Sequence, residues 1–356
     1  MERAFVIAAG GTGGHIIPGI CIGREIERAN ADLRVEYLCG SRAIESRIYA
    51  AEGIEPRRLS VGAELEKKLP GARFATMGVD FAAILARWLL HRPAGVLAMG
   101  GAVCFPALFA ARLLGVPVFL HESNRIPGRV VRMFRSGARR LFLGMGGAEG
   151  NNVETTGTPA KTRDVAVPAR DTIACVGGSQ GAARLNELFL EAARLLHPQF
   201  PWLKIVLVSG PGKAVEAPLG VEVRAYENDM PSLLSRAVAM VSRSGSGSMA
   251  DIANFRVPAV LVPYPHAMDD HQLANARYFS DRGAALLAEE AGLDGARLAD
   301  MLRSIISDAH LSAGMKDQLG ILSTPDAACL IARRIREELD SPVLALRGDP
   351  RKASRA

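Results

Sequence analysis

The stretch AFVIAAGGTGGHIIPGI, residues 4–20, joins a short apolar run to a helix-like pattern through four glycines and a histidine. Residues 4–9 form a strand candidate because they are continuously apolar and end at a turn signal. The glycines at positions 10, 11, 13 and 14 let the backbone approach an anion closely, with amide N–H groups and a helix N-terminus aimed at it. The stretch therefore predicts the first strand, turn and helix of a parallel α/β sheet.

The same arrangement recurs in TIACVGGSQGAARLNE, residues 172–187, whose first glycine lies 167 residues after Gly10. Apolar strand candidates alternate with helical patterns nearly throughout the chain, which is typical of parallel sheets covered by helices. We therefore expect an α/β fold with two doubly wound, Rossmann-like domains. The expected divisions are a first domain over 1–160, a second over 161–340 and a basic, disordered tail over 341–356.

Composition narrows the protein class. No apolar run reaches the roughly 18 residues that a membrane span needs, and the N-terminus enters a strand without a signal-peptide pattern. Five scattered cysteines without a CxxC pair favour reduced thiols over disulfides or a zinc site. These features lead us to expect a cytoplasmic protein.

The net charge of +6 is unevenly distributed, with 20 basic against 14 acidic residues in 1–160 and 19 against 22 in 161–340. Residues 124–140 carry six arginines and no acid, so they are either a solvated helix face or a surface for anionic lipid or phosphate. Residues 72–95 mix Phe81, Ile84, Leu85, Trp88 and Leu89 with Arg87, His91 and Arg92. That mixture suits an interfacial helix, and a buried helix with charged ends is the alternative.

Two common nucleotide motifs are absent from the glycine turns. A G-x-G-x-x-G fingerprint starting at Gly11 would need glycine where Ile16 stands, and the second strand ends at Cys39 without an acid. No G-x-x-x-x-G-K-[ST] sequence occurs either. These absences disfavour a nicotinamide dehydrogenase and a P-loop NTPase. A third turn, AMGGAVCFP at 98–106, adds Gly100 and Gly101 as anion-binding candidates, although tight strand-to-helix turns alone could require such glycines.

Residues 241–279 hold a fourth candidate segment, in which a strand ends at SRSGSGS and a helix follows. Asp251, early in that helix, could accept both hydroxyls of a ribose or simply complement the helix dipole. The later loop carries two acids followed by His271 and Gln272, which suit sugar hydroxyls. A metal site is disfavoured because one histidine beside two adjacent acids has no known ligand spacing.

Together the motifs GGTGGHIIPG, HESNRIPG, GGSQGAARLNE, SRSGSGSMADIA and PYPHAMDDHQLANA resemble the MurG family of bacterial glycosyltransferases, over residues 4 to about 280. Members transfer N-acetylglucosamine from UDP-GlcNAc to undecaprenyl-pyrophosphoryl-MurNAc-pentapeptide (lipid I), making lipid II for peptidoglycan. The resemblance implies a GT-B fold, with two Rossmann-like domains facing a central cleft. The first domain would hold mainly the acceptor and the second mainly UDP-GlcNAc.

The resemblance also implies roles for individual residues. His15 matches the family's histidine, as catalytic base or as a contact of the acceptor diphosphate; a neutral imidazole suits the base role. The acceptor diphosphate would lie at Gly13, Gly14, His15, Gly100 and Gly101. UDP-GlcNAc would be bound by Thr12, Gly13, Gly14, Asn124, Lys161, Ser179, Gln180, Gly181, Arg243, Ser246, Asp251, His271 and Gln272.

Departures from the family pattern concern the donor side. Asp251 stands where the family has glutamate for the ribose, Lys161 stands where it has arginine, and Glu227 stands where an aliphatic residue is common. A lysine offers a point charge in place of a bidentate fork. These changes bear on the affinity for the donor more than on the reaction type.

The resemblance implies no cofactor, no metal and no nucleic-acid partner. The expected location is peripheral, on the cytoplasmic face of the plasma (inner) membrane, because lipid I lies in a bilayer and an anionic membrane surface would attract the basic first half. Three alternatives remain open. They are a related diacylglycerol-type glycosyltransferase, a UDP-GlcNAc 2-epimerase, which would need carboxylates in the cleft besides Glu122, and a non-catalytic lipid-diphosphate binder.

Overall fold

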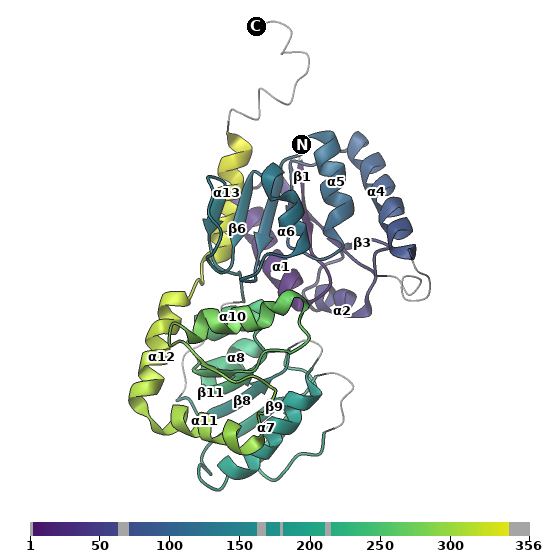
Figure 1. Ribbon diagram of the computed structural model, residues 1–356. Coiled ribbons are helices and arrows are strands. Elements are labelled where there is room, and N and C mark those ends of the chain that lie inside the picture. The colour runs from purple at the N-terminus through teal and green to yellow at the C-terminus, as the bar shows by residue number, and fades with distance from the viewer. Residues whose placement is uncertain (1–2, 63–70, 162–168, 179–180, 211–214, 342–356) are drawn as a thin grey trace, which may run out of the picture. The chain divides into compact units, whose positions relative to one another are not determined.

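The computed structural model describes residues 3–62, 71–161, 169–178, 181–210, 215–341. The chain divides into two compact units (Figure 1). The first contains residues 1–123, 127–160 and 326–356, and the second contains residues 124–126 and 161–325. Each unit is a parallel sheet covered by helices.

The first unit is built on a seven-stranded parallel sheet in the order β3-β2-β1-β4-β5-β6-β7. The strands are β1 (Arg3–Ala8), β2 (Leu33–Cys39), β3 (Arg57–Arg58), β4 (Gly95–Ala98), β5 (Val118–Glu122), β6 (Arg140–Leu143) and β7 (Val153–Thr155). The order reverses between β1 and β4, which is the switch point of a doubly wound sheet. The turns after these two strands therefore lie side by side at one edge of the sheet.

The helices of the first unit connect these strands and cover both faces of the sheet. They are α1 (Gly13–Ala29), α2 (Ala43–Ala51), α4 (Ala72–Leu90), α5 (Cys104–Leu114), α6 (Arg129–Phe134), the 3-10 turn η1 (Arg135–Gly137) and α13 (Ala327–Asp340). Because both faces are covered, β4 and β5 are buried at every residue, including the polar residues His121 and Glu122 that end β5.

The second unit repeats the plan with six parallel strands in the order β10-β9-β8-β11-β12-β13. The strands are β8 (Thr172–Val176), β9 (Lys204–Val208), β10 (Val221–Arg224), β11 (Ala237–Ser242), β12 (Ala259–Leu261) and β13 (Leu286–Leu287). Its switch point lies between β8 and β11. The glycine turn that follows β8 and the serine-rich turn that follows β11 are therefore neighbours.

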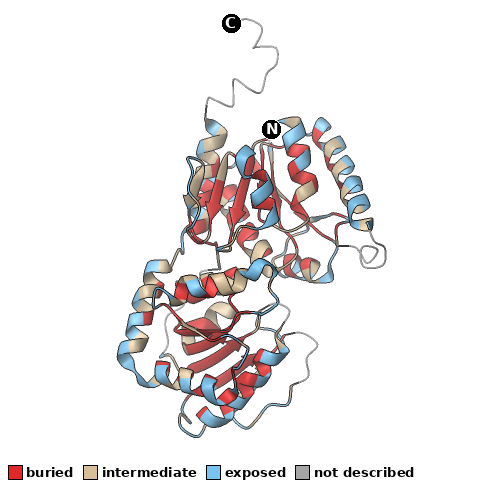
Figure 2. Cartoon of the chain, viewed as in Figure 1, coloured by how far each residue is buried: buried red, intermediate tan, exposed pale blue. Residues whose placement is uncertain are grey.

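Most α-helices of the second unit begin at an aspartate or glycine cap, whereas the first of them begins at Ala182. The helices are α7 (Ala183–Leu196), α8 (Met230–Arg236), α9 (Ser246–Phe255), the 3-10 turn η2 (Met268–Asp270), α10 (His271–Ser280), α11 (Gly295–Ser307) and α12 (Ala309–Leu322). Three of these helices start at an aspartate whose side chain accepts amide hydrogen bonds, as in Asp294 before α11. In Figure 2 the central strands are mostly red, and many helices have buried residues on one side and pale blue, exposed residues on the other.

The two-domain α/β expectation is confirmed, because both sheets are parallel and doubly wound. One expected boundary is wrong, since residues 326–340 belong to the first unit and not to the second. Helix α13 buries Ile331, Ala332 and Ile335 in the same core cluster as α1 residues such as Ile22, and Arg336 binds Asn30 and Asp32. The chain therefore returns to its first unit after completing the second. The expected disordered tail lies outside the described residues, apart from Ser341.

Candidate functional site

The glycine turns after β1 and β4 form one site in the first unit. Gly11, Gly100 and Gly101 have φ of 91°, 110° and 82°, in the left-handed region that disfavours side chains. A Cβ on Gly101 would lie 3.0 Å from the carbonyl oxygen of Gly10, so the two turns touch backbone to backbone. Thr12 has extended backbone angles, and α1 begins at Gly13, so its first amide groups point out of the turn. The predicted acceptor-diphosphate residues are thus brought together.

His15 lies in the first turn of α1, against the β4 turn. Its Nδ1 is 3.0 Å from the carbonyl oxygen of Gly10. A carbonyl only accepts hydrogen bonds, so Nδ1 carries the proton, and in the neutral ring Nε2 has the free lone pair. A Cβ on Gly100 would lie 2.9 Å from Nε2, so only glycine leaves room for the imidazole. The arrangement fixes the tautomer in which Nε2 can accept a proton.

His121 and Glu122, at the end of β5, support the same edge of the sheet. His121 is buried, and burial lowers its pKa to about 4, so it is neutral at pH 7. Its Nε2 donates to the carbonyl of Gly157, and its Nδ1 accepts from the hydroxyl of Ser123. The Glu122 carboxylate accepts the amide N–H of Gly128 at 2.6 Å. Both side chains therefore hold loops in place.

In the second unit, the glycine turn after β8 approaches the end of β9. A Cβ on Gly181 would lie 2.5 Å from the carbonyl oxygen of Ser209, and its φ is 68°. Asn186 in α7 donates to that same carbonyl at 2.9 Å. The predicted donor residues Ser179 and Gln180 lie outside the described residues. The described part of the turn has the tight backbone that a phosphate-binding loop needs.

Arg243, at the end of β11, is buried with only 6% of its surface exposed. Its guanidinium donates to the carbonyls of Val262 and Pro263, pairs with Glu290 and stacks 5.6 Å from the Tyr264 ring. These contacts join the end of β11 to the end of β12. Arg243 therefore braces the turn after β11 from inside the unit, and Ser246, the first residue of α9, is buried in the same turn.

Asp251 lies in the middle of α9 and makes no hydrogen bond or ion pair within 4 Å among the described residues. Burial raises the pKa of its carboxyl to about 7, and the charge of Lys161 opposes that rise. The carboxyl therefore changes charge near neutral pH. The charge of Lys161 acts on the Asp251 carboxyl, so these two departures from the family pattern lie near each other.

The loop before α10 is strained. Asp269 and Asp270 have φ of 54° and 52°, values that non-glycine residues adopt at a cost of about 1–3 kcal/mol each. His271 Nδ1 lies 2.7 Å from the carbonyl of Met268, and Gln272 Oε1 accepts the amide N–H of Tyr264 at 2.9 Å. Because these atoms are engaged, His271 Nε2 and the Gln272 amide nitrogen are the groups left to meet a ligand. The strained backbone of Asp269 and Asp270 therefore directly precedes the polar side chains of His271 and Gln272.

Asn275 was not among the predicted site residues, yet it organises this region. The side chain is fully buried. Its Oδ1 accepts the amide N–H of Arg125 at 2.9 Å, and its Nδ2 donates to Asn124 Oδ1 at 3.1 Å and to the carbonyl of Ser244 at 3.0 Å. It therefore fixes the Asn124 side chain on the second unit. Its only sequence signal was its place inside the PYPHAMDDHQLANA motif.

The described residues include neither a candidate metal cluster nor a candidate membrane-spanning helix. Within them, no three His, Cys, Asp or Glu side chains gather as they would around a metal ion. No helix there has the length and apolar character to cross a bilayer.

Known proteins match both units. The glycosyltransferase family 28 N-terminal domain matches residues 5–143, and its C-terminal domain matches residues 172–331. A UDP-N-acetylglucosamine--N-acetylmuramyl-(pentapeptide) pyrophosphoryl-undecaprenol N-acetylglucosamine transferase from Methylococcus capsulatus is 32% identical over 95% of this chain and 99% of its own length. This chain belongs to the MurG family of glycosyltransferases. The resemblance inferred from the sequence motifs is confirmed.

Solved structures agree with this family at the level of the fold. Acinetobacter baumannii MurG has a TM-score of 0.74 and 23% identity, covering 95% of this chain and all of the MurG chain. A putative UDP-N-acetylglucosamine 2-epimerase from Listeria monocytogenes has a TM-score of 0.71 at 13% identity, covering 96% and 97% of the two chains. The GT-B fold is therefore shared by MurG and by epimerases, and side chains must distinguish the two.

The sequence-predicted residues fall into two groups, one in each unit. In the first unit the turns after β1 and β4 bring together Thr12, Gly13, Gly14, His15, Gly100 and Gly101. In the second unit the described candidates are Asn124, Lys161, Gly181, Arg243, Ser246, Asp251, His271 and Gln272. Their roles toward a ligand stay predictions. Sequence reasoning missed Asn275 and Glu290, because both act through partners that are distant in the sequence.

Proposed function

We propose that this chain is the transferase that moves N-acetylglucosamine from UDP-GlcNAc to the MurNAc 4-hydroxyl of lipid I, with inversion at the anomeric carbon, giving lipid II and UDP. The observation that carries the proposal is full-length similarity to relatives named for that transfer. The two glycine-rich turns at the sheet switch points fit a substrate with several phosphates.

His15 is the proposed base for the acceptor hydroxyl. The protonated Nδ1 bonded to Gly10 leaves Nε2 as the proton acceptor, and the ring is fixed before substrate arrives. A fixed imidazole with one proton-accepting nitrogen suits general-base catalysis of an alcohol attacking a sugar. The proton moves from the 4-hydroxyl to Nε2 as the new C–O bond forms and the bond to UDP breaks.

The leaving UDP gains negative charge, and the second unit offers groups to stabilise it. The amides of the turn after β8 and the N-terminus of α9 supply partial positive charge to the diphosphate. Lys161 adds a full charge near Asp251, which would accept the ribose hydroxyls. His271, Gln272 and Asn124 would hold the sugar. The chain's own residues thus provide stabilisation along the whole donor.

The proposal is tested by UDP release from UDP-GlcNAc with and without a lipid I analogue. We expect release that depends on the acceptor, and a His15→Ala variant with a turnover number lower by roughly 10²–10⁴-fold. Turnover in EDTA tests the expected absence of a metal. Near-normal turnover of His15→Ala would assign the histidine to diphosphate binding. Formation of an epimerised UDP-sugar would favour the epimerase alternative, although the Glu122 carboxylate is already committed to Gly128.

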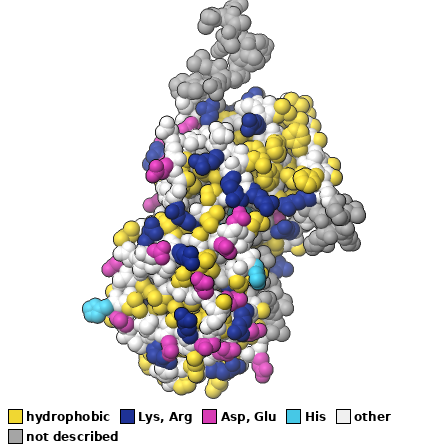
Figure 3. All heavy atoms as spheres, viewed as in Figure 1, with side chains coloured by type: hydrophobic (Ala, Val, Ile, Leu, Met, Phe, Trp, Pro, Cys, Tyr) yellow, Lys and Arg dark blue, Asp and Glu magenta, His cyan; other side chains and the backbone are white. Residues whose placement is uncertain are grey.

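Membrane docking is the second part of the proposal, on the cytoplasmic face of the plasma membrane. Large apolar side chains are exposed on α4, α5 and α6, and Figure 3 shows hydrophobic side chains gathered there beside a row of Lys and Arg. These exposed residues are Phe74, Val79, Leu89, Leu90, Phe109, Leu113 and Met133. A groove of about 680 Å³ between α4 and α5 continues the apolar surface. An apolar patch bordered by cations fits an anionic bilayer.

The sequence predicted either an interfacial helix or a buried helix with charged ends for residues 72–95, and each interpretation describes one face of α4. Ile84 and Trp88 are buried in the core, so they cannot enter a bilayer, whereas Leu89 is 68% exposed. Arg87 pairs with Glu36, and Arg92 donates to the carbonyl of Gly115. The helix is therefore half core and half docking surface.

Sedimentation with anionic vesicles tests the docking. Binding is expected at low salt and should weaken as salt rises. A Leu89→Glu and Leu113→Glu double variant should lose it. The matched control is Ile321→Glu, which changes an apolar residue that is 75% exposed on α12. Equal binding of the double variant and the control would refute this surface.

A further inference from the structure

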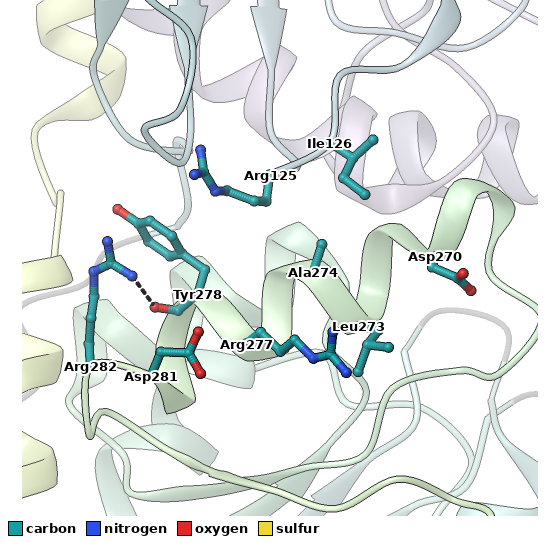
Figure 4. A pocket seen from close by; sticks show the side chains of 9 residues that line it. All are labelled: Arg125, Ile126, Asp270, Leu273, Ala274, Arg277, Tyr278, Asp281 and Arg282. Atoms are coloured by element: carbon teal, nitrogen blue, oxygen red, sulfur yellow. Dashed lines mark hydrogen bonds between the residues drawn. The ribbon is translucent and has the colours of Figure 1, made fainter.

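The second unit contains a cavity that donor binding does not explain. It has a volume of about 410 Å³ and lies along α10 and the Asn124–Ile126 segment (Figure 4). Its lining combines three arginines, one tyrosine, two aspartates and three apolar residues. They are Arg125, Arg277, Arg282, Tyr278, Asp270, Asp281, Ile126, Leu273 and Ala274.

Two of the arginines share one aromatic ring. The guanidinium of Arg282 lies 3.9 Å from the Tyr278 ring centroid, and that of Arg125 lies 5.6 Å from it. Figure 4 shows both guanidinium groups beside the ring, with Arg282 also donating to the carbonyl of Tyr278. Two cations held side by side repel each other, and a bound anion would relieve that repulsion. Cation–π contacts orient their N–H groups without neutralising them.

Acids among the described residues compensate the positive charges of Arg282 and Arg277 only in part. Arg282 has no carboxylate within 4 Å among the described residues. Arg277 has one weak, exposed partner, Glu289 at 3.8 Å. Asp281 and Asp270 line the pocket at its two ends, so the lining carries three positive and two negative charges. An elongated ligand with both an anionic group and apolar parts fits this lining better than a compact phosphate does.

The pocket starts beside the proposed sugar site. Asp270 precedes His271 and Gln272, the proposed sugar contacts, whereas Arg282 lies beyond the last turn of α10. The ten residues of α10 cover about 15 Å along the helix axis. Five residues of extended peptide span about 17 Å. The pocket therefore begins beside the proposed GlcNAc contacts, where the acceptor's muramyl sugar would also lie, and α10 is about as long as an extended pentapeptide.

We infer that this pocket binds the peptide arm of the acceptor, with the free C-terminal carboxylate at Arg282 and Arg125. The inference rests on the proposed function, because the relatives' names supply the pentapeptide. A muramyl peptide begins at its sugar and ends in a carboxylate, so its anionic end would reach the far end of α10. The second unit would then recognise the acceptor's peptide as well as the donor.

The test uses three acceptors that share the lipid, diphosphate and sugar. One carries the pentapeptide with a free C-terminal carboxylate, one carries its C-terminal amide, and one carries no peptide. The full chain and its Arg282→Gln, Arg282→Lys and Arg297→Gln variants are compared. Arg297 is an exposed arginine on α11, outside the pocket, and serves as the control.

The wild-type chain should have a KM for the carboxylate acceptor about 10-fold below that for the amide, because a charge-assisted pair is lost in the amide. Arg282→Gln should abolish that difference without changing the KM for UDP-GlcNAc, Arg282→Lys should keep part of it, and Arg297→Gln should keep all of it. Thermal unfolding checks that each variant is folded.

Three results would overturn the inference. They are equal KM values of the wild type for all three acceptors, an unchanged preference in Arg282→Gln, or a loss in Arg282→Gln that is equally large with the peptide-free acceptor. The last result would assign the arginine to the diphosphate or the lipid surface. Absence of transfer to any acceptor would instead contradict the proposed function, so the two failures are distinguishable.

Discussion

Replacing Asn275 with alanine should weaken both the fold of the second unit and its hold on the donor. The substitution removes three hydrogen bonds at once, to Arg125, Asn124 and Ser244. The carbonyl of Ser244 belongs to a fully buried residue, so water cannot replace its partner. A buried group left without a partner costs about 1–3 kcal/mol, and the two more accessible groups cost about 0.5–1.5 kcal/mol each. We expect a total loss of about 2–6 kcal/mol from these three groups.

Asn186→Ala is the matched control, because it deletes the same side chain from a nearly fully buried position in the same unit. Asn186 makes one described hydrogen bond, and its Oδ1 is already buried without a partner. Its removal should therefore cost only about 1 kcal/mol beyond the cavity, which is common to both variants. The measurement is urea unfolding followed by circular dichroism.

The KM for UDP-GlcNAc distinguishes a role of Asn275 in positioning Asn124 from a role in stability alone. Asn275→Asp keeps the shape and the acceptor for Arg125 but replaces two donated hydrogen bonds by repulsion. It should raise the KM for UDP-GlcNAc by about 10-fold, as Asn275→Ala should, because Asn124 loses its anchor. Equal destabilisation by Asn275→Ala and Asn186→Ala, or a wild-type donor KM in both Asn275 variants, would refute the reasoning.

Three further predictions concern groups at the two sites. The pKa of Asp251 is raised to about 7 in the folded chain, so folding favours the protonated acid, and the free energy of unfolding should fall as pH rises from about 4 to about 7. In urea titrations, Asp251→Asn should remove that part of the fall. The KM for UDP-GlcNAc should decrease as pH rises through 7 in the wild type but not in the variant. Glu290→Gln leaves the buried Arg243 without its carboxylate and should destabilise the chain by about 3–5 kcal/mol, measured by urea unfolding; a loss below about 1 kcal/mol would contradict the brace role. Gly100→Ala would place a Cβ 2.9 Å from His15 Nε2 at a φ of 110°, so the turnover number should drop as in His15→Ala. In the control Gly314→Ala, on α12, the new Cβ meets nothing within 4 Å, so this variant should keep full turnover and gain up to about 1 kcal/mol in the free energy of unfolding. Full turnover of Gly100→Ala would show that the His15 ring need not stay in place.

Most of the central strands could be read from the sequence, because a buried parallel strand is a continuous apolar run that ends at a turn. The apolar runs that begin at residues 4, 95, 172 and 238 all became central strands. The edge strands β3, β7 and β13 were not predicted, since two or three residues that pair at a sheet margin need no hydrophobic run. The glycine turns were predictable for a related reason: positive φ values require glycine wherever the fold places them.

The sequence by itself determined two parallel sheets, their switch-point turns and the family, because period, turn chemistry and motif order are local properties of the chain. Tertiary structure alone decided that residues 326–340 return to the first unit and that residues 124–126 belong to the second. It also decided that Asn275 meets Asn124, 151 positions away, and that Glu290 neutralises Arg243. Such pairs are selected by burial and by the hydrogen-bonding needs of desolvated groups, which no local pattern records.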